Sequence, residues 1–372
     1  MITKILFDNY KPFAGENEIE IRPITLLFGK NNSGKSSLTH LICLMESLVH
    51  SQNTVDYKQF LGDLINIYTF HNLWTTGLRL GLVNEVGNEL SFSFIRNSGK
   101  VFLHAISVND KVTEFPQSQA VELAQSNTVI KDTIRECGYD INDWSVSTDY
   151  LGPIRSIPSS LYKVKNSHLD KIGKEGENAF ELLVNSYEGD KALYNDVSSW
   201  MGTHLDRLFL QISHLPQFDD YYFFQAKNDS EVVALPLSEI GEGYSQVLPV
   251  IVQSFIDSVP SINIVEQPEL HLHPAVHANI AERLIDSVKS GDKRYVIESH
   301  SENFLLALRR AVNNPENPLT SEDVAIYFVD RIDGETRLKN IRILDNGDLS
   351  SWPTGVFGEG FELMKDIIRN RK

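Results

Sequence analysis

The amino-acid sequence predicts an α/β fold in which a mixed sheet with an antiparallel β subdomain is interrupted by an inserted, mainly helical lobe. Short β-prone runs alternate with helix-like patterns at both ends of the 372-residue chain, a rhythm typical of α/β domains. Residues 111–235 differ, because they are more polar and carry helix-like stretches near 120–137 and 178–183. We therefore expect one domain built from residues 1–110 and 236–372, with the lobe inserted into it.

Several strand-like runs support this fold in the first part of the chain. Three runs precede residue 30, and three more follow a helix-like pattern and look antiparallel to one another. These runs are residues 1–13, 18–21, 24–28, 80–83, 90–95 and 101–108. A turn is expected at 97–99, whereas residues 60–74 give no clear pattern.

The composition indicates a globular protein, with 41% hydrophobic and 23% charged residues. No apolar run is long enough to cross a bilayer and no basic-then-apolar leader opens the chain, so we expect a cytoplasmic location. Cys43 and Cys137 stand alone in the sequence, which argues against a disulfide framework and a cysteine-based metal cluster. The net charge of −16 favours protein partners, because binding to DNA would require a local basic patch.

A phosphate-binding loop follows the third strand. Residues 29–36 read Gly-Lys-Asn-Asn-Ser-Gly-Lys-Ser and fit G-x-x-x-x-G-K-[ST], with a strand before and a helix after. Such a loop curls backbone N–H groups round a phosphate at a helix N-terminus. Lys35 is expected to reach the β- and γ-phosphates and Ser36 to ligate Mg²⁺, while Asn31 and Asn32 suit positions of positive φ. The sequence therefore predicts a nucleotide-binding site.

A second β-prone run, residues 261–266, ends in an acid and is followed by Gln267, Pro268 and Glu269. A buried strand of a parallel sheet delivers its last residue to the carboxyl edge, where phosphates bind. Glu266 is therefore expected to hold Mg²⁺, directly or through water. The alternative is a surface acid that happens to follow a strand.

Two histidines follow this run. His271 and His273 alternate in an extended segment with Glu269, and histidine with carboxylate suits Zn²⁺. No further ligand is identifiable, and Pro274 marks a turn that opens a helix at 275–288. We therefore favour a structural or dimer-contact role for both histidines over a zinc site.

A strand at 294–298 leads to His300, just before a helix that starts near residue 302. This order places His300 at the carboxyl end of a strand, beside the expected phosphate site. An imidazole there could donate to the γ-phosphate or orient water. The alternative is a histidine that caps the helix or fills the turn.

Residues 239–246 form a second element suited to anions, because glycine, serine and glutamine precede an apolar helix at 247–256. One chain needs only one phosphate loop. This second element makes most sense if it closes over nucleotide held by another copy, in a two-fold sandwich.

Taken together, these motifs resemble the ABC-type ATPases of the OLD/RecF/SMC branch, above all the stand-alone bacterial AAA-type ATPases related to OLD proteins. The motifs that carry the resemblance are residues 29–37, 150–155, 241–246, 266–269, 272–274, 298–302, 347–349 and 352–355. Residues 51–145 and 185–230 are poorly covered. The resemblance implies an ABC-type ATPase head with a P-loop, whose cofactors are ATP and Mg²⁺ and which forms a homodimer or higher homo-oligomer around ATP.

The resemblance also implies roles for single positions. The phosphate-binding residues would be Gly29, Asn31, Asn32, Ser33, Gly34, Lys35, Ser36 and Ser37. Gly243 and Ser245 would form the signature element, which acts on the γ-phosphate of the opposite subunit. Glu266 would be the Walker B acid and, with Ser36, a metal ligand. His300 would be the switch histidine, and the loop at 273–274 would contact the other subunit of the dimer.

One position departs from the family pattern. Many relatives carry a second acid directly after the Walker B acid, where it polarises the attacking water, whereas this chain has Gln267. A glutamine orients water but cannot accept its proton at neutral pH. We therefore expect slow hydrolysis with Glu269 assisting. The predicted catalytic residues are Lys35, Glu266, Gln267, Glu269 and His300.

Three further side chains have open roles. Arg155 could contact a nucleotide phosphate or a neighbouring subunit, since guanidinium suits phosphate, or form a surface salt bridge. Lys11 ends the first strand beside the phosphate loop. Gln59 is the available counterpart of a glutamine loop.

Several functions are compatible with these motifs. The first hypothesis is an ATP-driven switch in bacterial anti-phage defence, which rests on family analogy. Its effector is expected to be a separate protein, a nuclease, because OLD relatives often carry a fused C-terminal nuclease for which this chain lacks room. The alternative is a RecF-like DNA-repair clamp with a basic stripe and salt-sensitive DNA binding. The motor of a membrane transporter ranks last, because the signature departs from the usual transporter form. A module that binds ATP without hydrolysing it is a further alternative, because Gln267 stands where many relatives have an acid.

Overall fold

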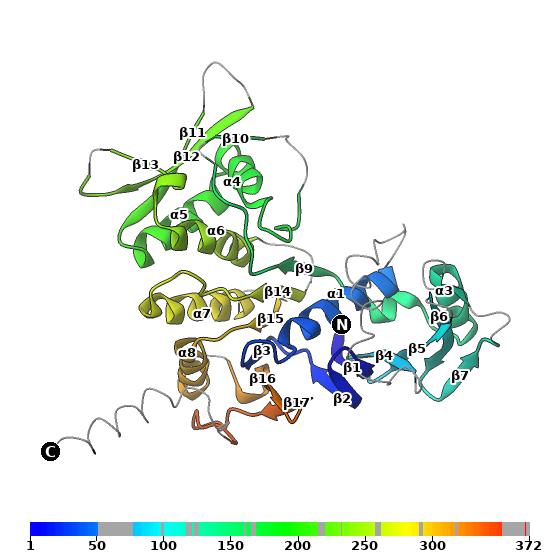
Figure 1. Ribbon diagram of the computed structural model, residues 1–372. Coiled ribbons are helices and arrows are strands. Elements are labelled where there is room, and N and C mark those ends of the chain that lie inside the picture. The colour runs from blue at the N-terminus through cyan, green and yellow to red at the C-terminus, as the bar shows by residue number, and fades with distance from the viewer. Residues whose placement is uncertain are drawn as a thin grey trace.

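The structure is a computed structural model that describes residues 1–50, 77–97, 100–116, 121–122, 126–159, 161–164, 169–214, 220–231, 233–256, 262–289, 293–316, 319–351 and 369. Its main element is a mixed sheet of 13 strands, which runs through the centre of Figure 1. None of the helices in this described part combines the length and the apolar character that a membrane crossing requires.

The centre of the sheet is parallel. β3 (Ile24–Gly29) lies between β15 (Arg294–Glu298) and β16 (Val324–Ile332), and β14 (Ile262–Glu266) and β9 (Thr148–Leu151) follow beyond β15. All four of these pairings are parallel, so the carboxyl ends of the strands meet at one edge. Every residue of β3 is buried, as expected for a strand that is covered on both faces.

Helices cover both faces of the parallel strands. α1 (Lys35–His50) packs on one face. α6 (Glu242–Phe255), α7 (Pro274–Lys289) and α8 (Glu302–Asn313) contribute to the core on the other face. Successive residues of β3 alternate between these two cores, because side chains along a strand point to opposite faces.

The rest of the main sheet is largely antiparallel and extends from β16 to the right-hand side of Figure 1. Its strands are β17 (Glu335–Ile341), β2 (Phe13–Glu20), β1 (Ile2–Tyr10), β4 (Leu78–Asn84), β5 (Glu89–Asn97), β6 (Lys100–Val108), β7 (Lys111–Glu114) and β8 (Val121–Glu122). The helix α3 (Ser126–Glu136) and a 3-10 turn, η5 (Ile141–Trp144), pack near β6 and β4. The strands predicted in the first 110 residues are confirmed, while residues 60–74 and part of the turn at 97–99 lie outside the described residues.

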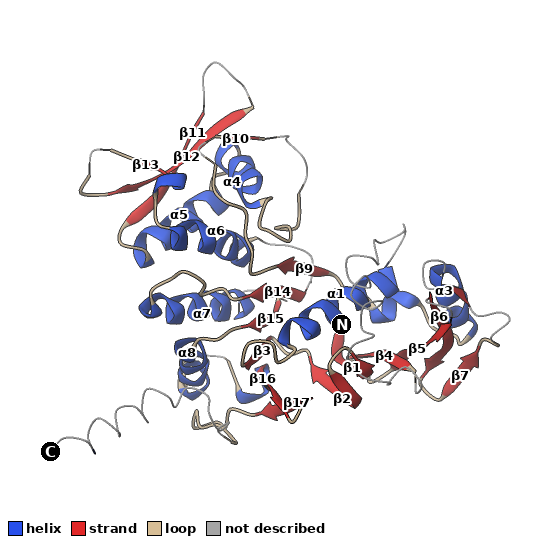
Figure 2. Cartoon of the chain, in the orientation of Figure 1, coloured by secondary structure: helices blue, strands red, loops and turns tan. Residues whose placement is uncertain are grey.

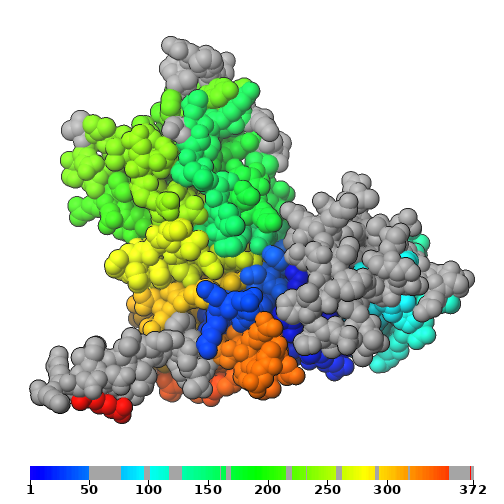
Figure 3. All heavy atoms as spheres, viewed as in Figure 1, coloured from blue at the N-terminus to red at the C-terminus, as the bar shows by residue number. Residues whose placement is uncertain are grey.

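A second unit stands above the main sheet, coloured green in Figure 3. Figure 2 shows that it combines helices with strands. Its elements are β10 (Tyr162–Lys163), α4 (Ala179–Glu188), α5 (Ala192–His204), β11 (Leu208–His214), β12 (Tyr221–Asn228) and β13 (Leu235–Pro236). The four strands form a separate sheet, and the chain re-enters the main domain through a 3-10 turn, η6 (Leu237–Glu239), and α6.

The predicted lobe at 111–235 differs from this arrangement in two respects. β7, β8 and β9 fall inside that range but pair with strands of the main sheet. The part outside the sheet contains four strands besides its helices. The strands within 111–235 are short or mixed in polarity, as in the Thr-Asp-Tyr-Leu of β9, so they lack a clear periodic signal. The division into domains stays a prediction.

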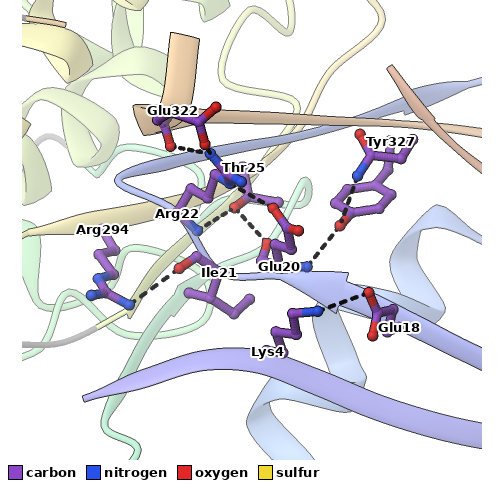
Figure 4. A network of polar contacts seen from close by, with 10 residues as sticks. Lys4, Glu18, Glu20, Ile21, Arg22, Thr25, Arg294, Glu322 and Tyr327 are labelled. Carbon is purple, nitrogen blue, oxygen red and sulfur yellow. Dashed lines mark hydrogen bonds and ion pairs between the residues drawn. The ribbon is translucent and has the colours of Figure 1, made fainter. Parts of the chain in front are cut away.

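The amino edge of the parallel strands, opposite the predicted site, is held by arginines (Figure 4). Arg22 donates to the carboxylates of Glu20, at 2.6 Å, and Glu322, at 2.7 Å. Arg294, the first residue of β15, donates to the main-chain oxygen of Ile21 at 3.1 Å. These contacts join the start of β15 and β16 to the segment between β2 and β3.

Candidate functional site

The phosphate loop is a tight turn between β3 and α1. Gly29 has φ of 148°, Gly34 of 108° and Asn32 of 62°, so the expected positive φ at Asn32 is confirmed, whereas Asn31 has none. The helix starts directly after the loop, at Lys35. The free N–H groups of its first turn therefore lie at the carboxyl edge of the sheet, as an anion site requires.

Lys35 lies inside this loop with only 3% of its surface exposed. Its ammonium donates to the main-chain oxygens of Gly29 at 3.1 Å and Lys30 at 2.8 Å. Its Nζ is 3.7 Å from Oε1 of Glu298. Burial lowers the pKa of Lys35, and the Glu298 carboxylate opposes that shift. The lysine is thus held at the strand edge where a phosphate would bind.

The three serines of the loop differ in their hydrogen bonds. The Ser33 hydroxyl is buried and has no hydrogen-bond partner within the described residues. The Ser36 hydroxyl donates to Oε2 of Glu298 at 2.8 Å, and the Ser37 N–H donates to the Gly34 oxygen at 3.0 Å. An unpartnered buried hydroxyl beside lysine and free N–H groups fits a phosphate.

Glu266 and Glu298 end neighbouring parallel strands and lie directly beside each other in the register of β14 and β15. Glu266 Oε1 accepts hydrogen bonds from the Thr39 hydroxyl and, at 3.1 Å, from the Tyr150 hydroxyl. Burial and the neighbouring Glu298 charge raise the pKa of Glu266 to about 7. Burial also raises the pKa of Glu298. Two buried carboxylates at one edge therefore form a site of strong negative potential, which a cation would relieve.

Glu298 is not among the site residues predicted from the sequence. It ends an apolar strand in the same way as Glu266, so the signal used for Glu266 could have found it. Its contacts with Lys35 and Ser36 depend on the pairing of β15 with β3. That pairing joins segments about 270 residues apart and leaves no trace in local sequence.

The donor set of this edge fits Mg²⁺. The Ser36 hydroxyl and the carboxylates of Glu266 and Glu298 offer oxygen ligands only. Mg²⁺ prefers one or two carboxylates together with phosphate oxygens and water. The residues present therefore suit the expected cofactor.

Gln267 and Glu269 follow directly after β14. Gln267 adopts a left-handed backbone conformation, with φ of 48°, and its N–H donates to the main-chain oxygen of Glu298 at 2.7 Å. Glu269 Oε1 accepts from the Ser299 hydroxyl at 2.8 Å and from the His300 N–H at 2.7 Å. Glu269 Oε2 is buried without a hydrogen-bond partner in the described part of the chain. The segment after β14 is thus tied to the segment after β15.

His300 lies at the carboxyl end of β15, as predicted, and is exposed. Partial burial of its ring and the positive charge of Lys35 lower its pKa. The neutral imidazole is therefore the main form near pH 7. His273 instead caps a helix, since its Nδ1 accepts from the Ala275 N–H at 3.2 Å at the start of α7, and His271 Nδ1 lies 3.7 Å from Glu242.

The signature element begins α6. A Cβ on Gly243 would lie 2.5 Å from the main-chain oxygen of His271, so only glycine allows this close packing. Ser245 is 4% exposed and donates to the Glu242 oxygen at 2.9 Å. Among the described residues no hydrogen bond or ion pair joins Gly243 or Ser245 to the phosphate loop of their own chain. Their action on a second copy stays a prediction.

The remaining candidates have different positions. Arg155 is 4% exposed and donates to three main-chain oxygens. It therefore forms no surface salt bridge with any residue that the structure describes, and it is not exposed for a phosphate. The reason is that its guanidinium lies between α6 and the end of β14. Lys11 lies in the turn between β1 and β2, and the neighbouring Pro12 lies close to Gly34, since a Cβ on that glycine would be 2.8 Å from the proline ring. Gln59 lies outside the described residues.

Comparisons with known proteins agree with this architecture. Residues 144–307 match the family described as "AAA domain, putative AbiEii toxin, Type IV TA system", and residues 319–367 match one described as a protein of unknown function. The Old nuclease of Escherichia phage P2 is 21% identical over 348 residues, which cover 83% of this chain and 58% of the relative. The chain thus spans little more than half the length of that nuclease.

Two solved structures have similar folds. The Smc head bound to the C-terminal winged-helix domain of ScpA gives a TM-score of 0.58 at 12% identity, over 92% of this chain and 98% of that one. The Pyrococcus furiosus Smc head with an extended coiled coil, bound to the C-terminal domain of ScpA, gives 0.54 at 11% identity, over 99% of both chains.

The fold is therefore that of an ABC-type P-loop ATPase head of the SMC kind. Within that class the chain is OLD-like, as its similarity to the Old nuclease and to the AAA family shows. The resemblance stated from the sequence motifs is confirmed.

Proposed function

We propose that this chain binds and slowly hydrolyses ATP with Mg²⁺, dimerises around the nucleotide, and thereby switches an effector protein. One observation carries the proposal. Lys35, Ser36, Glu266 and Glu298 converge at the carboxyl ends of adjacent strands, directly at the phosphate loop. A lysine, a hydroxyl and two carboxylates at a helix N-terminus are the groups that a magnesium-bound triphosphate needs.

Different residues of the site would hold the phosphates and the metal ion. The N–H groups of the loop and the Lys35 ammonium would hold the β- and γ-phosphates. Ser36, Glu266 and Glu298 would hold Mg²⁺, which when bound neutralises charge on the phosphates. Thr39 and Tyr150 fix Glu266 by donating to its Oε1, and neither contact uses its Oε2.

Gln267 would orient the attacking water. Its backbone is fixed by the hydrogen bond to Glu298, and Glu269 fixes the neighbouring His300 segment. Gln267 cannot take a proton. Phosphoryl transfer depends mainly on positioning and charge stabilisation, so the missing carboxylate should slow hydrolysis and not abolish it.

The wider role rests on relatives. The Smc heads were solved in complex with domains of ScpA, which supports a head of this fold that binds a partner protein. The similarity to the Old nuclease supports an effector with nuclease activity, in cytoplasmic anti-phage defence. The net charge of −16 suits a protein partner. A RecF-like DNA clamp stays an untested alternative.

Nucleotide binding and self-association test the proposal together. A fluorescent ATP analogue with Mg²⁺ should bind the wild-type protein, and light scattering should show ATP-dependent dimers. Lys35→Ala should weaken binding roughly 10- to 100-fold, because it removes charge-assisted hydrogen bonds to phosphate. Lys339→Ala, at an exposed lysine on β17, is the matched control and should change nothing. Equal affinity of the Lys35 variant and the wild type would overturn the site.

The effector is tested by purification from the native host with and without ATP. A nuclease that co-elutes only with ATP supports the switch. Co-elution of DNA alone, lost at high salt, would favour the clamp.

A further inference from the structure

Arg155 joins two elements of the proposed site that belong to different parts of the fold. Its Nη1 donates to the Gln246 oxygen in α6 at 3.0 Å. Its Nη2 donates to the oxygens of Glu266, at 2.8 Å, and Gln267, at 3.1 Å. One planar guanidinium thus spans from the signature helix to the end of β14.

This arginine is buried, with 4% of its surface exposed. Burial lowers its pKa to about 10, and the carboxylates of Glu269 and Glu266 oppose the shift. A buried cation is costly unless it is hydrogen-bonded: both Nη atoms of Arg155 have partners, whereas its Nε has none among the described residues. The segment that carries it is itself anchored, because the N–H groups of Gly152 and Ser156 donate to the oxygens of Lys174 at 2.8 Å and Glu175 at 2.9 Å.

The carbonyl groups that Arg155 binds belong to the signature helix and to the segment that carries Gln267. Gln246 follows directly after the signature residues on the same helix. Gln267 has φ of 48°, a conformation that a non-glycine residue keeps only when its surroundings impose it. At the other end of the same segment, Gly243 packs against the His271 oxygen. The segment 267–271 is therefore linked to the signature helix at both ends, directly at His271 and through the guanidinium at Gln267.

We propose that Arg155 is a positioning residue that couples the signature helix to Gln267. When α6 meets nucleotide held by a second copy, a displacement of its first turns would reach the Gln267 backbone through the guanidinium. Hydrolysis would then depend on dimer formation. This inference rests on the proposed function and adds to it a route by which the dimer controls the water-orienting residue.

Arg155→Lys tests the coupling. Lysine keeps the charge but cannot donate to both elements in a fixed plane. In the wild type, phosphate release per chain should rise with protein concentration as dimers form. In Arg155→Lys, ATP affinity and ATP-dependent dimers should persist, while turnover in the dimer falls roughly 10- to 100-fold, since small misplacements have effects of that size.

A matched control is Arg283 of α7, which contacts the other end of α6. Arg283 donates to the Ser254 hydroxyl at 3.1 Å and the Ser254 oxygen at 3.2 Å, at the far end of α6 from the signature. Arg283→Lys therefore makes the same exchange without touching β14, and stimulation by dimerisation should be intact. A role that is merely structural would instead lower the melting temperature, ATP affinity and dimerisation of Arg155→Lys together, and that result would overturn the proposal.

The proposed function and the coupling through Arg155 can fail separately. If the wild type shows no ATP-dependent dimers or turnover, the proposed function fails. If the wild type shows both and Arg155→Lys keeps full stimulation, the coupling fails alone. Should Arg155→Lys not fold, Arg155→Met, which removes the buried charge, replaces it. Amide hydrogen exchange gives a separate reading on the wild type: the Gln267 N–H should exchange more slowly in ATP-bound dimers, and an unchanged rate would overturn the coupling.

Discussion

Replacing Glu266 with glutamine should stabilise the protein without nucleotide at pH 8, although the same change should weaken its binding of magnesium and ATP. The folded protein holds the Glu266 carboxyl at a pKa of about 7, against an ordinary value of 4.5, because it is buried beside Glu298. Glu266 is 3% exposed, so solvent screens this effect little. The ionised Glu266 side chain therefore lowers the stability of the folded protein.

The direction with pH follows from the raised pKa. Between pH 4.5 and about 7 the folded chain keeps a proton that the unfolded chain releases, so stability falls as pH rises through this window. Above pH 7 the full penalty applies, and the difference between the two pKa values corresponds to about 3 kcal/mol. Glutamine carries no charge and keeps an oxygen to accept from Thr39 and Tyr150, so Glu266→Gln should recover most of this energy.

Thermal unfolding with EDTA at pH 5.5 and pH 8 measures the effect. For a chain of this length, about 3 kcal/mol corresponds to a rise in melting temperature of about 4 °C. The rise should be full at pH 8 and less than half as large at pH 5.5, because pH 5.5 lies only about one unit above the unfolded pKa of 4.5. Glu114→Gln, at an exposed acid on β7, is the control. A variant that is destabilised equally at both pH values, or a wild type whose stability does not depend on pH, would refute the reasoning.

Three further changes test other parts of the site. Glu298→Gln removes the carboxylate beside Lys35 and should raise the Mg²⁺ concentration needed for ATP binding roughly 10- to 100-fold; a magnesium titration with an unchanged midpoint would contradict its assignment as a ligand. Gly243→Ala places a Cβ 2.5 Å from a main-chain oxygen, so it should lower the stability by about 1–3 kcal/mol and prevent dimerisation. The control Gly241→Ala, with nothing within 4 Å of the new Cβ, should be tolerated. Equal melting temperatures of the two variants would count against this packing. Gln267→Glu supplies a proton acceptor and should speed steady-state phosphate release by roughly 100-fold, so an unchanged or lower rate would speak against a water-orienting role.

Much of the fold could be read from local sequence, because its signals are local. The apolar run of β3 and the Gly-Lys-Ser that opens α1 are adjacent in the chain, and the alternation of side chains in β1 and β4 is visible within a few residues. The positive φ expected at Asn32 was confirmed on the same basis. The sequence pattern thus predicted these strands, the helix α1 and the turn at Asn32.

The missing parts depend on pairing between distant segments. β9 joins the main sheet through β14, more than 100 residues later, so no local pattern placed it there. Glu298 became part of the site only through its neighbours on β3 and β14. Arg155 was expected to contact a nucleotide phosphate or a neighbouring subunit, or to form a surface salt bridge. Its partners are main-chain oxygens, and a contact of that kind cannot be predicted from residue types.

The order of strands in the sheet also sets the time at which the chain can fold. β3 is apolar and fully buried, yet both of its neighbours, β15 and β16, come about 270 to 300 residues later. At a synthesis rate of roughly 5–20 residues per second, this strand waits on the order of 15–60 s on the ribosome before either neighbour exists. Such late closure slows folding and exposes an aggregation-prone edge. We therefore expect the yield of soluble protein to depend strongly on growth temperature and on chaperones that cover nascent chains.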